Sequence, residues 1–377
     1  MEKKKINLHI YPSPFRNESR ILKETRSIID LGLAGEVFIA ASWLPGLPQE
    51  EIIDDKRKVF RFKSVFQRLP GNIITEGLRF IHIVLLIFFK FRNSKPEYVN
   101  CHSLSVLFAG VLFKKFSDSI LIYDAHELET ERAGLRGFKQ KLAKWLERRL
   151  IKYTDYIIVV SESIAEWYKK EYSIRDVIVM RNIPDSRNFK IEKNTILKDK
   201  FSIADNELIF IYQGILNKGR GVEILLNAFS KTVPGKHLVM MGYGALENMV
   251  KEYERRFSNI HFQPAVKPFE IMKYTMGCDV GISLIENIGL SYYYSLPNKF
   301  FEYILSGVPV IASDFPDMSS VVKKYNCGWL TEVNSDCFCS LLAQIDLKDI
   351  QAKRENCLKI DSLSWKNEEK ELLKINS

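Results

Sequence analysis

The segment SLPNKFFEYILSGVPVIASD (residues 295–314) joins a helical pattern directly to an apolar strand, and it decides the fold. Pro297 suits the first turn of a helix because its missing N–H costs nothing there, and Ser295 can cap that turn. Gly307 can end the helix. The spacing predicts a helix over about 296–306 followed by a buried strand, PVIASD. Such a step is one unit of the alternation that builds parallel sheets.

The same alternation of apolar strands and helical patterns runs along the whole chain. The first series of expected strands is 6–11, 37–41, 59–64, 97–103, 120–127, 156–163 and 177–185. The second series is 208–216, 237–244, 259–266, 279–285 and 309–314. We therefore predict an α/β protein with two doubly wound, Rossmann-like domains that face each other across a cleft. Ligands of such sheets bind beyond the carboxyl ends of the strands.

The length of 377 residues suits two hydrophobic cores better than one. Between the two series the pattern loses its periodicity in DSRNFKIEKNTILKDK, which indicates a connecting segment. We predict an N-terminal domain over 1–187, a linker over 188–200 and a second domain over 201–355.

Composition excludes disorder and fibrous repeats, since 46% of residues are hydrophobic and 27% charged. The six cysteines are scattered, and Cys337 and Cys339 have no histidine or second pair at metal-ligand spacing, so we expect reduced thiols and a cytoplasmic protein. No secretory signal is expected, because the stretch after the basic Met1–Lys5 is short and polar. The net charge of +9 indicates an anionic partner, which could be nucleic acid, a phosphorylated small molecule or a membrane face.

The segment LRFIHIVLLIFFKFR, residues 78–92, bears on the membrane question. Its apolar run is too short for a span. Two interpretations stay open: a helix buried in a domain core, or a helix in the bilayer interface with Arg79, Lys90 and Arg92 towards the headgroups.

Two segments could bind phosphate. In YQGILNKGRGVEILLNAF a strand ends at Gly214, and the following glycine-rich loop brings Lys218 and Arg220 towards a ligand. This is not a Walker A loop, because the required glycine spacing and the final Lys-Ser/Thr are absent. A basic loop without a ligand is the alternative.

The second phosphate candidate is the start of the helix at Asn298. Its backbone N–H groups and dipole attract an anion, and Lys299 adds a mobile ammonium group. Glu302, one turn later, suits the vicinal hydroxyls of a ribose, so the pair indicates a nucleotide. An ordinary solvated Lys and Glu are the alternative. The GxG in MGYGALE, which begins at Met241, lacks a third glycine and predicts a tight turn at Gly242 that can help to wall a nucleotide site.

Taken together, several motifs resemble the retaining nucleotide-sugar glycosyltransferases of the GT-B fold, family 4 type. They are the loop after Gly214, NKFFEY, GVPVIASD, YDAHE, VSESIAEWYKK and RNIPD. A late segment around Trp365 resembles the final helix of that family. The resemblance implies that residues 356–377 cross back to the N-terminal domain, which would bind the acceptor, while the second domain binds the nucleotide sugar.

The resemblance also implies roles for individual residues. Arg220 and Lys218 would hold the donor diphosphate, and Glu302 the ribose. The backbone at Ala265 and Val266 would meet the base. These residues, with Gly214, Gly242, Asn298 and Lys299, form the expected donor site.

Catalytic roles follow from the same likeness. His126 of DAHE would lie at the donor sugar, although a histidine at a strand end can be purely structural. Where the family carries the first of two glutamates, this chain has Tyr294, so Glu286 from ENIGL, or tyrosine hydroxyls at 292–294, could serve instead. The family's paired-glycine loop is replaced by PSPFRNESR, whose Arg16 and Arg20 could meet an acceptor phosphate or the donor.

The expected function is the transfer of a hexose, with retention and without a metal ion, from a nucleoside diphosphate sugar. On family grounds the donor is a UDP-sugar. The acceptor would be a glycan or lipid-linked saccharide in the synthesis of bacterial surface polysaccharide, such as capsule or O-antigen. No cofactor or metal is expected beyond the donor. The charge and the segment 78–92 favour work at the anionic cytoplasmic membrane face, and no motif supports nucleic-acid binding. A nucleotide-sugar 2-epimerase and a catalytically inactive binding subunit remain alternatives.

Overall fold

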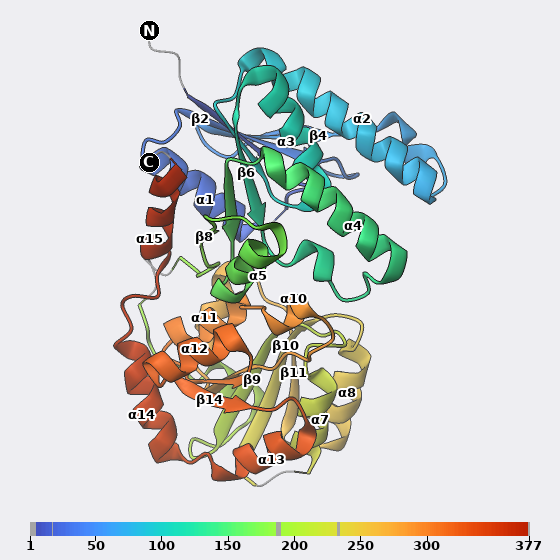
Figure 1. The fold of residues 1–377 in the computed structure, drawn as a ribbon. Coiled ribbons are helices and arrows are strands. Elements are labelled where there is room, and N and C mark those ends of the chain that lie inside the picture. Colours follow the sequence, from blue (N-terminus) through green and yellow to red (C-terminus); the bar gives the residue numbers. More distant parts are fainter. Residues whose placement is uncertain (1–4, 17, 186–189, 232–233, 376–377) are drawn as a thin grey trace. The chain divides into compact units, whose positions relative to one another are not determined.

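The computed structural model describes residues 5–16, 18–185, 190–231 and 234–375, and of Arg68, Ile73 and Ile74 it describes the backbone alone. The chain forms two compact units. Unit 1 consists of Met1–Arg181 together with Glu368–Ser377, and unit 2 of Asn182–Asn367. Each unit is an α/β domain built on its own sheet (Figure 1).

Unit 1 contains an eight-stranded sheet in the order β3-β4-β2-β1-β5-β6-β7-β8. The strands are β1 (Ile6–Ile10), β2 (Glu36–Ser42), β3 (Glu50–Ile52), β4 (Arg57–Phe62), β5 (Tyr98–Cys101), β6 (Ile120–Ala125), β7 (Tyr156–Val159) and β8 (Ile178–Val179). All neighbouring pairs are parallel except β3 with β4. The central strands are buried on both faces, as expected for a sheet with helices on each side.

The helices of unit 1 form two layers. They are α1 (Ser19–Asp30), α2 (Ile73–Phe91), α3 (Leu104–Ser117), α4 (Gly137–Leu150) and α5 (Glu162–Tyr172), with short 3₁₀ turns η1 (Val65–Arg68), η2 (Arg92–Ser94), η3 (Glu129–Glu131), η4 (Ile151–Tyr153) and the C-terminal η6 (Glu369–Ile375). Right-handed crossovers that advance in one direction along the sheet place α2, α3 and α4 on one face. The crossover through α1 runs the other way, so α1 and its neighbour η6 cover the opposite face (Figure 1).

Unit 2 contains a fully parallel six-stranded sheet in the order β11-β10-β9-β12-β13-β14. The strands are β9 (Leu208–Ile215), β10 (Lys236–Tyr243), β11 (Ile260–Pro264), β12 (Val280–Ser283), β13 (Val310–Ser313) and β14 (Gly328–Thr331). The helices are α6 (Ile196–Phe201), α7 (Val222–Ser230), α8 (Glu247–Arg256), α9 (Ile271–Thr275), α10 (Leu290–Tyr293), α11 (Asn298–Leu305), α12 (Pro316–Tyr325), α13 (Ser335–Gln344), α14 (Leu347–Leu358) and α15 (Trp365–Glu368, whose last residue belongs to unit 1), with η5 (Pro268–Glu270).

Strand alternation divides the core of unit 2 into two clusters. Ile209 and Ile211 of β9 join the cluster that contains α11, whereas Phe210 and Tyr212 join the cluster that contains α7. Successive side chains of a strand point to opposite faces, so the sheet carries one apolar layer on each side. The position of α11 is therefore fixed by packing rather than by its own short length.

A glycine brings α11 close to the sheet. A Cβ added at Gly281 in β12 would lie 2.2 Å from Cγ of Tyr303 in α11. Tyr303 then reaches the neighbouring central strand β9, where its hydroxyl accepts a hydrogen bond from the Gln213 N–H at 2.9 Å. Any larger residue at 281 would push the helix away.

The structure departs from the sequence expectations at some boundaries. Pro297 stands directly before α11 as its cap, and the Ser295 hydroxyl instead donates to the Tyr292 carbonyl at 2.7 Å. The contacts divide the chain at Arg181, before the expected linker over 188–200, and α6, which overlaps that range, already belongs to unit 2. The chain returns to unit 1 at Glu368 rather than at 356. Among the helices described, none has both the length and the apolarity needed to span a bilayer.

Candidate functional site

The loop between β9 and α7 carries Lys218 and Arg220 and is shaped by two glycines. Gly219 and Gly221 have φ values of 81° and 73°, in the left-handed region that favours glycine. A Cβ at Gly221 would lie 2.8 Å from Cβ of Leu284, so the loop passes close to the end of β12. Lys218 is exposed on this loop.

Glu286 is tied to the same loop by two hydrogen bonds. The Gly221 N–H donates to its Oε1 at 3.1 Å, and its own backbone N–H donates to the Gly219 carbonyl at 3.1 Å. The guanidinium carbon of Arg220 lies 4.8 Å from the ring centroid of Tyr292, a cation–π contact that orients the arginine. Sequence reasoning left open whether Glu286 could reach this region, and the structure places it beside the loop of Arg220.

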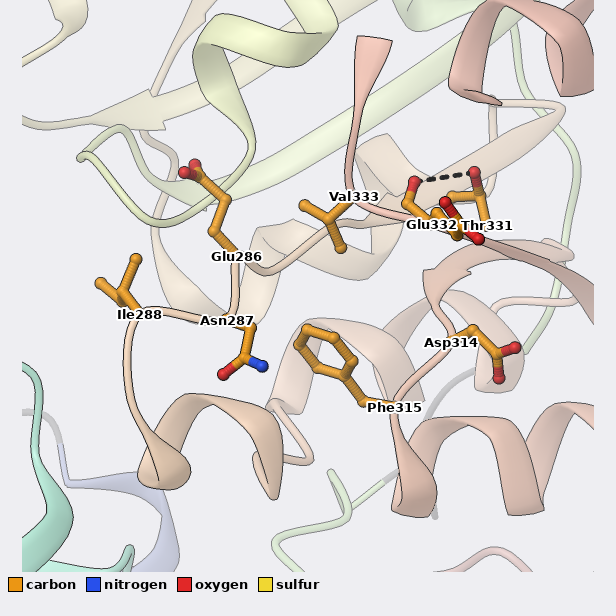
Figure 2. Close-up of a pocket in the computed structure, with 8 residues that line it drawn as sticks. All are labelled: Glu286, Asn287, Ile288, Asp314, Phe315, Thr331, Glu332 and Val333. Carbon is orange, nitrogen blue, oxygen red and sulfur yellow. Dashed lines mark hydrogen bonds between the residues drawn. The ribbon is translucent and has the colours of Figure 1, made fainter. Parts of the chain in front are cut away.

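A pocket of about 550 Å³ lies at the carboxyl ends of β12, β13 and β14. Glu286 lines one side of it, Asp314 and Glu332 the other, and Phe315 lies between them (Figure 2). Three carboxylates would repel a diphosphate, so this pocket suits hydroxyl groups better than anions. The cationic side of the site is therefore the loop of Arg220.

Lys299, in the first turn of α11, is buried against an aromatic ring. Its Nζ lies 3.6 Å from the ring centroid of Tyr212, only 9% of the residue is exposed, and no acceptor for the Nζ occurs among the described residues. Burial lowers its pKa well below the ordinary value, and the nearby Arg220 charge lowers it further, while Glu302 opposes the shift. Lys299 thus contacts Tyr212 of β9, the strand that leads into the loop of Arg220.

Glu302 is held at the carboxyl half of β9. Gln213 donates from Nε2 to its Oε2 at 2.5 Å, and the Oε1 of Gln213 in turn accepts from the Thr275 hydroxyl at 2.8 Å. Gln213 was missed by sequence reasoning. The sequence did contain a signal for it, because Gln213 is an amide in an otherwise apolar and aromatic strand, directly before Gly214.

Two glycines let the carboxyl ends of β9 and β10 approach each other closely. Gly214 pairs with Gly242, and a Cβ at Gly242 would lie 1.8 Å from the Gly214 carbonyl oxygen. After β11 the chain continues through the exposed Ala265, while Val266 packs against the α11 cluster. The expected donor residues thus all lie at or after the carboxyl ends of β9–β11 or on the first turns of α11, on which Asn298 is exposed.

His126 lies in unit 1, directly after β6, within a buried polar network. Its Nε2 is 3.0 Å from Oδ2 of Asp124, and His102 Nδ1 lies 2.9 Å from the same oxygen. Arg20 forms a bidentate ion pair with Asp124 at 2.8 and 3.0 Å. The expectation that Arg20 meets a substrate phosphate is wrong, because it is buried and also donates to the Met180 carbonyl; Arg16 is exposed.

The main charged groups of this network are the paired Asp124 and Arg20. Burial alone would raise the pKa of Asp124, but the Arg20 guanidinium and His126 outweigh it and hold that pKa well below its ordinary value. Burial lowers the pKa of His102 to about 4, so its ring is neutral at pH 7. Asp124 is therefore an ionised acceptor that orients His126, a role that sequence reasoning did not assign.

The same cluster is where described side chains come near enough to share a metal ion. The sets His9–Glu24–His102 and His102–Asp124–His126 place their ligand atoms within 4.8 Å of one another. Both ring nitrogens of His102 are already hydrogen-bonded, to His9 at 2.7 Å and to Asp124. In the structure these side chains belong to one buried hydrogen-bonded network.

The chain thus has two α/β domains with largely parallel sheets, and the second carries cations and a carboxylate at its strand ends. Comparisons with known proteins agree with this arrangement. The chain has the fold of the GT-B glycosyltransferases, and two glycosyltransferase family models match successive parts of it. Residues 31–185 match the model of Glycosyltransferase Family 4, and residues 193–349 match that of Glycosyl transferases group 1.

The curated relatives include two fungal enzymes named chitobiosyldiphosphodolichol beta-mannosyltransferase. That of Candida albicans is 25% identical over 260 residues, which are 63% of this chain and 56% of the relative. The chain thus matches a little over half the length of this relative. That of Kluyveromyces lactis is 22% identical over 346 residues, 81% of this chain and 74% of the relative.

Solved structures show the same fold across almost the whole chain. Sucrose-phosphate synthase of Thermosynechococcus elongatus has a TM-score of 0.79 at 14% identity and covers 99% of this chain and 98% of its own. HepE of Anabaena, in complex with UDP-glucose, has a TM-score of 0.73 at 13% identity and covers 98% of both chains. WaaG, a glycosyltransferase involved in lipopolysaccharide biosynthesis, has a TM-score of 0.66 at 14% identity, covering 96% of this chain and 98% of its own.

Proposed function

We propose that the protein transfers a hexose from a UDP-sugar, with retention and without a metal ion, to a hydroxyl of a glycan or lipid-linked acceptor in bacterial surface polysaccharide synthesis. The observation that carries this proposal is that Lys299 and Glu302 both contact the carboxyl half of β9, directly before the loop that carries Arg220. Two cations and one positioned carboxylate fit a diphosphate joined to a ribose.

The donor would bind along this edge of the sheet. Arg220 and Lys218 meet the diphosphate, the first turn of α11 at Asn298 adds its positive dipole end, and the backbone at Ala265 and Val266 meets the base. Glu302 accepts from the two ribose hydroxyls. Gly214 and Gly242 let the backbone approach the ligand.

Catalysis would consist mainly of stabilising the leaving diphosphate. Arg220, Lys218 and Lys299 neutralise the charge that develops as the bond from the anomeric carbon to the phosphate oxygen breaks. The acceptor oxygen forms the new bond on the same face, and its proton passes to that phosphate oxygen. Glu286 and His126 would contact the donor sugar, with Asp124 orienting the histidine.

Several findings support the finer parts of the proposal. A solved protein of this fold binds UDP-glucose, which favours uridine as the base. The name of the curated relatives specifies a mannosyl transfer and a diphosphodolichol acceptor, which favours a lipid-linked acceptor and makes mannose a second candidate sugar. Work on such an acceptor, together with the net charge of +9, favours peripheral association with the cytoplasmic membrane.

The first test is binding of a panel of nucleotide sugars, including UDP-hexoses and a nucleoside diphosphate mannose, measured by thermal shift and then calorimetry. We expect one UDP-hexose to stabilise the protein, and its anomeric configuration to be kept in the transferred product. A glycosyl adduct trapped on Glu286 or another carboxylate would refute the proposed proton transfer. Epimerisation of the donor without acceptor would favour the 2-epimerase, and donor binding without any transfer the inactive subunit.

A further inference from the structure

An exposed apolar stripe runs along α4, which carries no part of the sites described above. Phe138, Leu142 and Trp145 are 79%, 52% and 55% exposed and recur at i, i+4 and i+7, so they share one face of the helix. Single exposed apolar side chains are normal, but neighbouring ones that share one face form a patch of the kind that marks an interaction surface. The stripe continues to Arg149, whose guanidinium carbon lies 5.5 Å from the Trp145 ring centroid.

The charge on α4 has a single sign at the surface. Its cations, with one just beyond its end, are Lys139, Lys141, Lys144, Arg148, Arg149 and Lys152. Lys144 and Arg148 form ion pairs with Glu131 and Glu171, and no ion pair of Lys141 or Arg149 occurs in the described part of the chain. The helix is thus apolar along its centre and cationic at its flanks.

The only acidic residue of α4 is turned inward. Glu147 is fully buried and accepts hydrogen bonds from the hydroxyls of Tyr123, Tyr168 and Tyr172 at 2.7, 2.8 and 2.5 Å. This three-tyrosine anchor fixes the rotation of α4. It therefore holds the stripe outward instead of letting the helix roll its apolar face into the core.

Exposed apolar side chains also occur on α2 and α3, which pack with α4 in the same layer (Figure 1). On α2 the exposed residues are Leu78, Ile81, Leu85 and Phe89. Phe88 of α2 contacts the exposed Phe116 of α3 with ring centroids 5.7 Å apart, and Lys115 lies 4.6 Å from the ring centroid of Tyr153 in η4. These contacts link the end of α2 to α3, and α3 to η4, the turn that follows α4.

We propose that this three-helix face, the outer surfaces of α2, α3 and α4, docks unit 1 onto an anionic lipid surface, with α4 lying in the headgroup region. Phe138, Leu142 and Trp145 would enter the acyl boundary while Lys141 and Arg149 meet lipid phosphates. Nucleic acid fits less well, because aliphatic side chains line the centre of the face. A second copy of the chain fits less well, because the cations would oppose one another.

The inference identifies the membrane partner of the proposed function and rests on that function for its purpose, but the docking can be measured without any sugar transfer. It makes α4 the main helix in the bilayer interface, a position that the sequence pattern offered as one alternative for residues 78–92. In the structure those residues contribute a buried side, which includes Val84 and Ile87, and an exposed side that belongs to the three-helix face.

The test is co-sedimentation of the full chain with vesicles of phosphatidylcholine alone or mixed with phosphatidylglycerol. We expect binding only to the mixed vesicles, weakened by added salt. Lys141→Gln with Arg149→Gln should weaken it roughly thirtyfold, and Phe138→Ser, Leu142→Ser and Trp145→Ser together about a hundredfold. These side chains are exposed, so circular dichroism and thermal unfolding should stay unchanged.

Matched controls lie in unit 2. Phe269→Ser removes a side chain that is 66% exposed, and Lys231→Gln with Lys323→Gln removes two exposed cations; neither should alter vesicle binding. Arg220→Ala should lose donor binding and still sediment with vesicles, which separates the docking from the proposed function. Absence of binding, equal binding by the α4 variants, or loss of a dimer in these variants by light scattering would each overturn the proposal.

Discussion

Lys299 is the residue at which the site departs most from an ordinary surface. Burying an ammonium group against Tyr212, with no acceptor among the described residues, is costly, and burial accordingly lowers the pKa of Lys299 well below its ordinary value. A diphosphate brought to Arg220 would supply the missing anion. The residue is therefore poised to change protonation when the donor binds.

We predict that donor binding takes up a proton at Lys299. The free-state pKa is lowered, and a nearby anion raises it, so at a pH between the two values the lysine gains a proton on binding. Calorimetry in buffers of different ionisation enthalpy should show this uptake, and affinity should fall as the pH rises through the pKa of the complex. Lys299→Met should abolish the buffer dependence. The same heats in every buffer for the unaltered protein would contradict the assignment.

Arg220 and Glu302 are predicted to recognise different parts of one ligand. Glu302→Gln should weaken both uridine and UDP by about tenfold to a hundredfold, since a hydrogen bond to a charged group is worth about 1.5–3 kcal/mol. Arg220→Ala should weaken UDP by a similar factor and leave uridine almost unaffected. Titrations of both ligands against both variants check this, with Arg255→Ala as the surface control. Equal losses for the two ligands in both variants would refute the division of roles.

At the scale of elements, much of the fold was predictable because the strands of both sheets are apolar and separated by helical patterns. The strands that escaped prediction lack this signal. β3 reads EEI and is exposed throughout, and β14 reads GWLT, so neither is an apolar run. Both lie at sheet edges, where pairing with a neighbour decides strand formation more than sequence does.

The candidate site was predictable where the backbone dictates it. The glycines around Arg220 and the turn at Gly242 are visible in sequence because only glycine fits those positions. Side-chain direction is not visible in the same way. Arg20 was expected at a substrate and is paired with Asp124, and Ser295 was expected to cap α11 but bonds the Tyr292 carbonyl, since each found a nearer partner in the fold.

Gly281→Ala tests how strictly α11 is positioned. The added methyl would collide with the Tyr303 ring, so we expect a loss of about 1–3 kcal/mol of unfolding free energy from overpacking, with weaker donor binding because Lys299 and Glu302 move with the helix. Gly77→Ala in α2 is the control, since nothing lies within 4 Å of its added Cβ and alanine favours a helix; it should raise stability by up to about 1 kcal/mol. Chemical denaturation and UDP titration measure both effects, and unchanged donor affinity in Gly281→Ala would mean that α11 does not set the site.

At the scale of the whole molecule, the chain enters unit 2 once and then returns to complete unit 1 with its last segment. The return is anchored by Glu368, whose carboxylate accepts from the Arg181 backbone N–H at 2.7 Å and from its guanidinium at 2.6 and 3.0 Å. Glu369 accepts from the Ser27 hydroxyl at 2.5 Å. Unit 1 therefore depends on pairs of residues that are 187 and 342 positions apart in sequence.

Glu368→Ala should loosen unit 1 while leaving unit 2 intact. The carboxylate is buried and Arg181 is one-third exposed, so water partly compensates the lost pair and we expect a cost of about 1–3 kcal/mol rather than that of a fully buried ion pair. Hydrogen exchange should rise in β8, α1 and η6, which share this contact region, and stay unchanged in β9–β13. The exposed Glu355→Ala on α14 is the matched control. Faster exchange throughout both units would show that the C-terminal segment stabilises the chain as one cooperative whole, contrary to its assignment to unit 1.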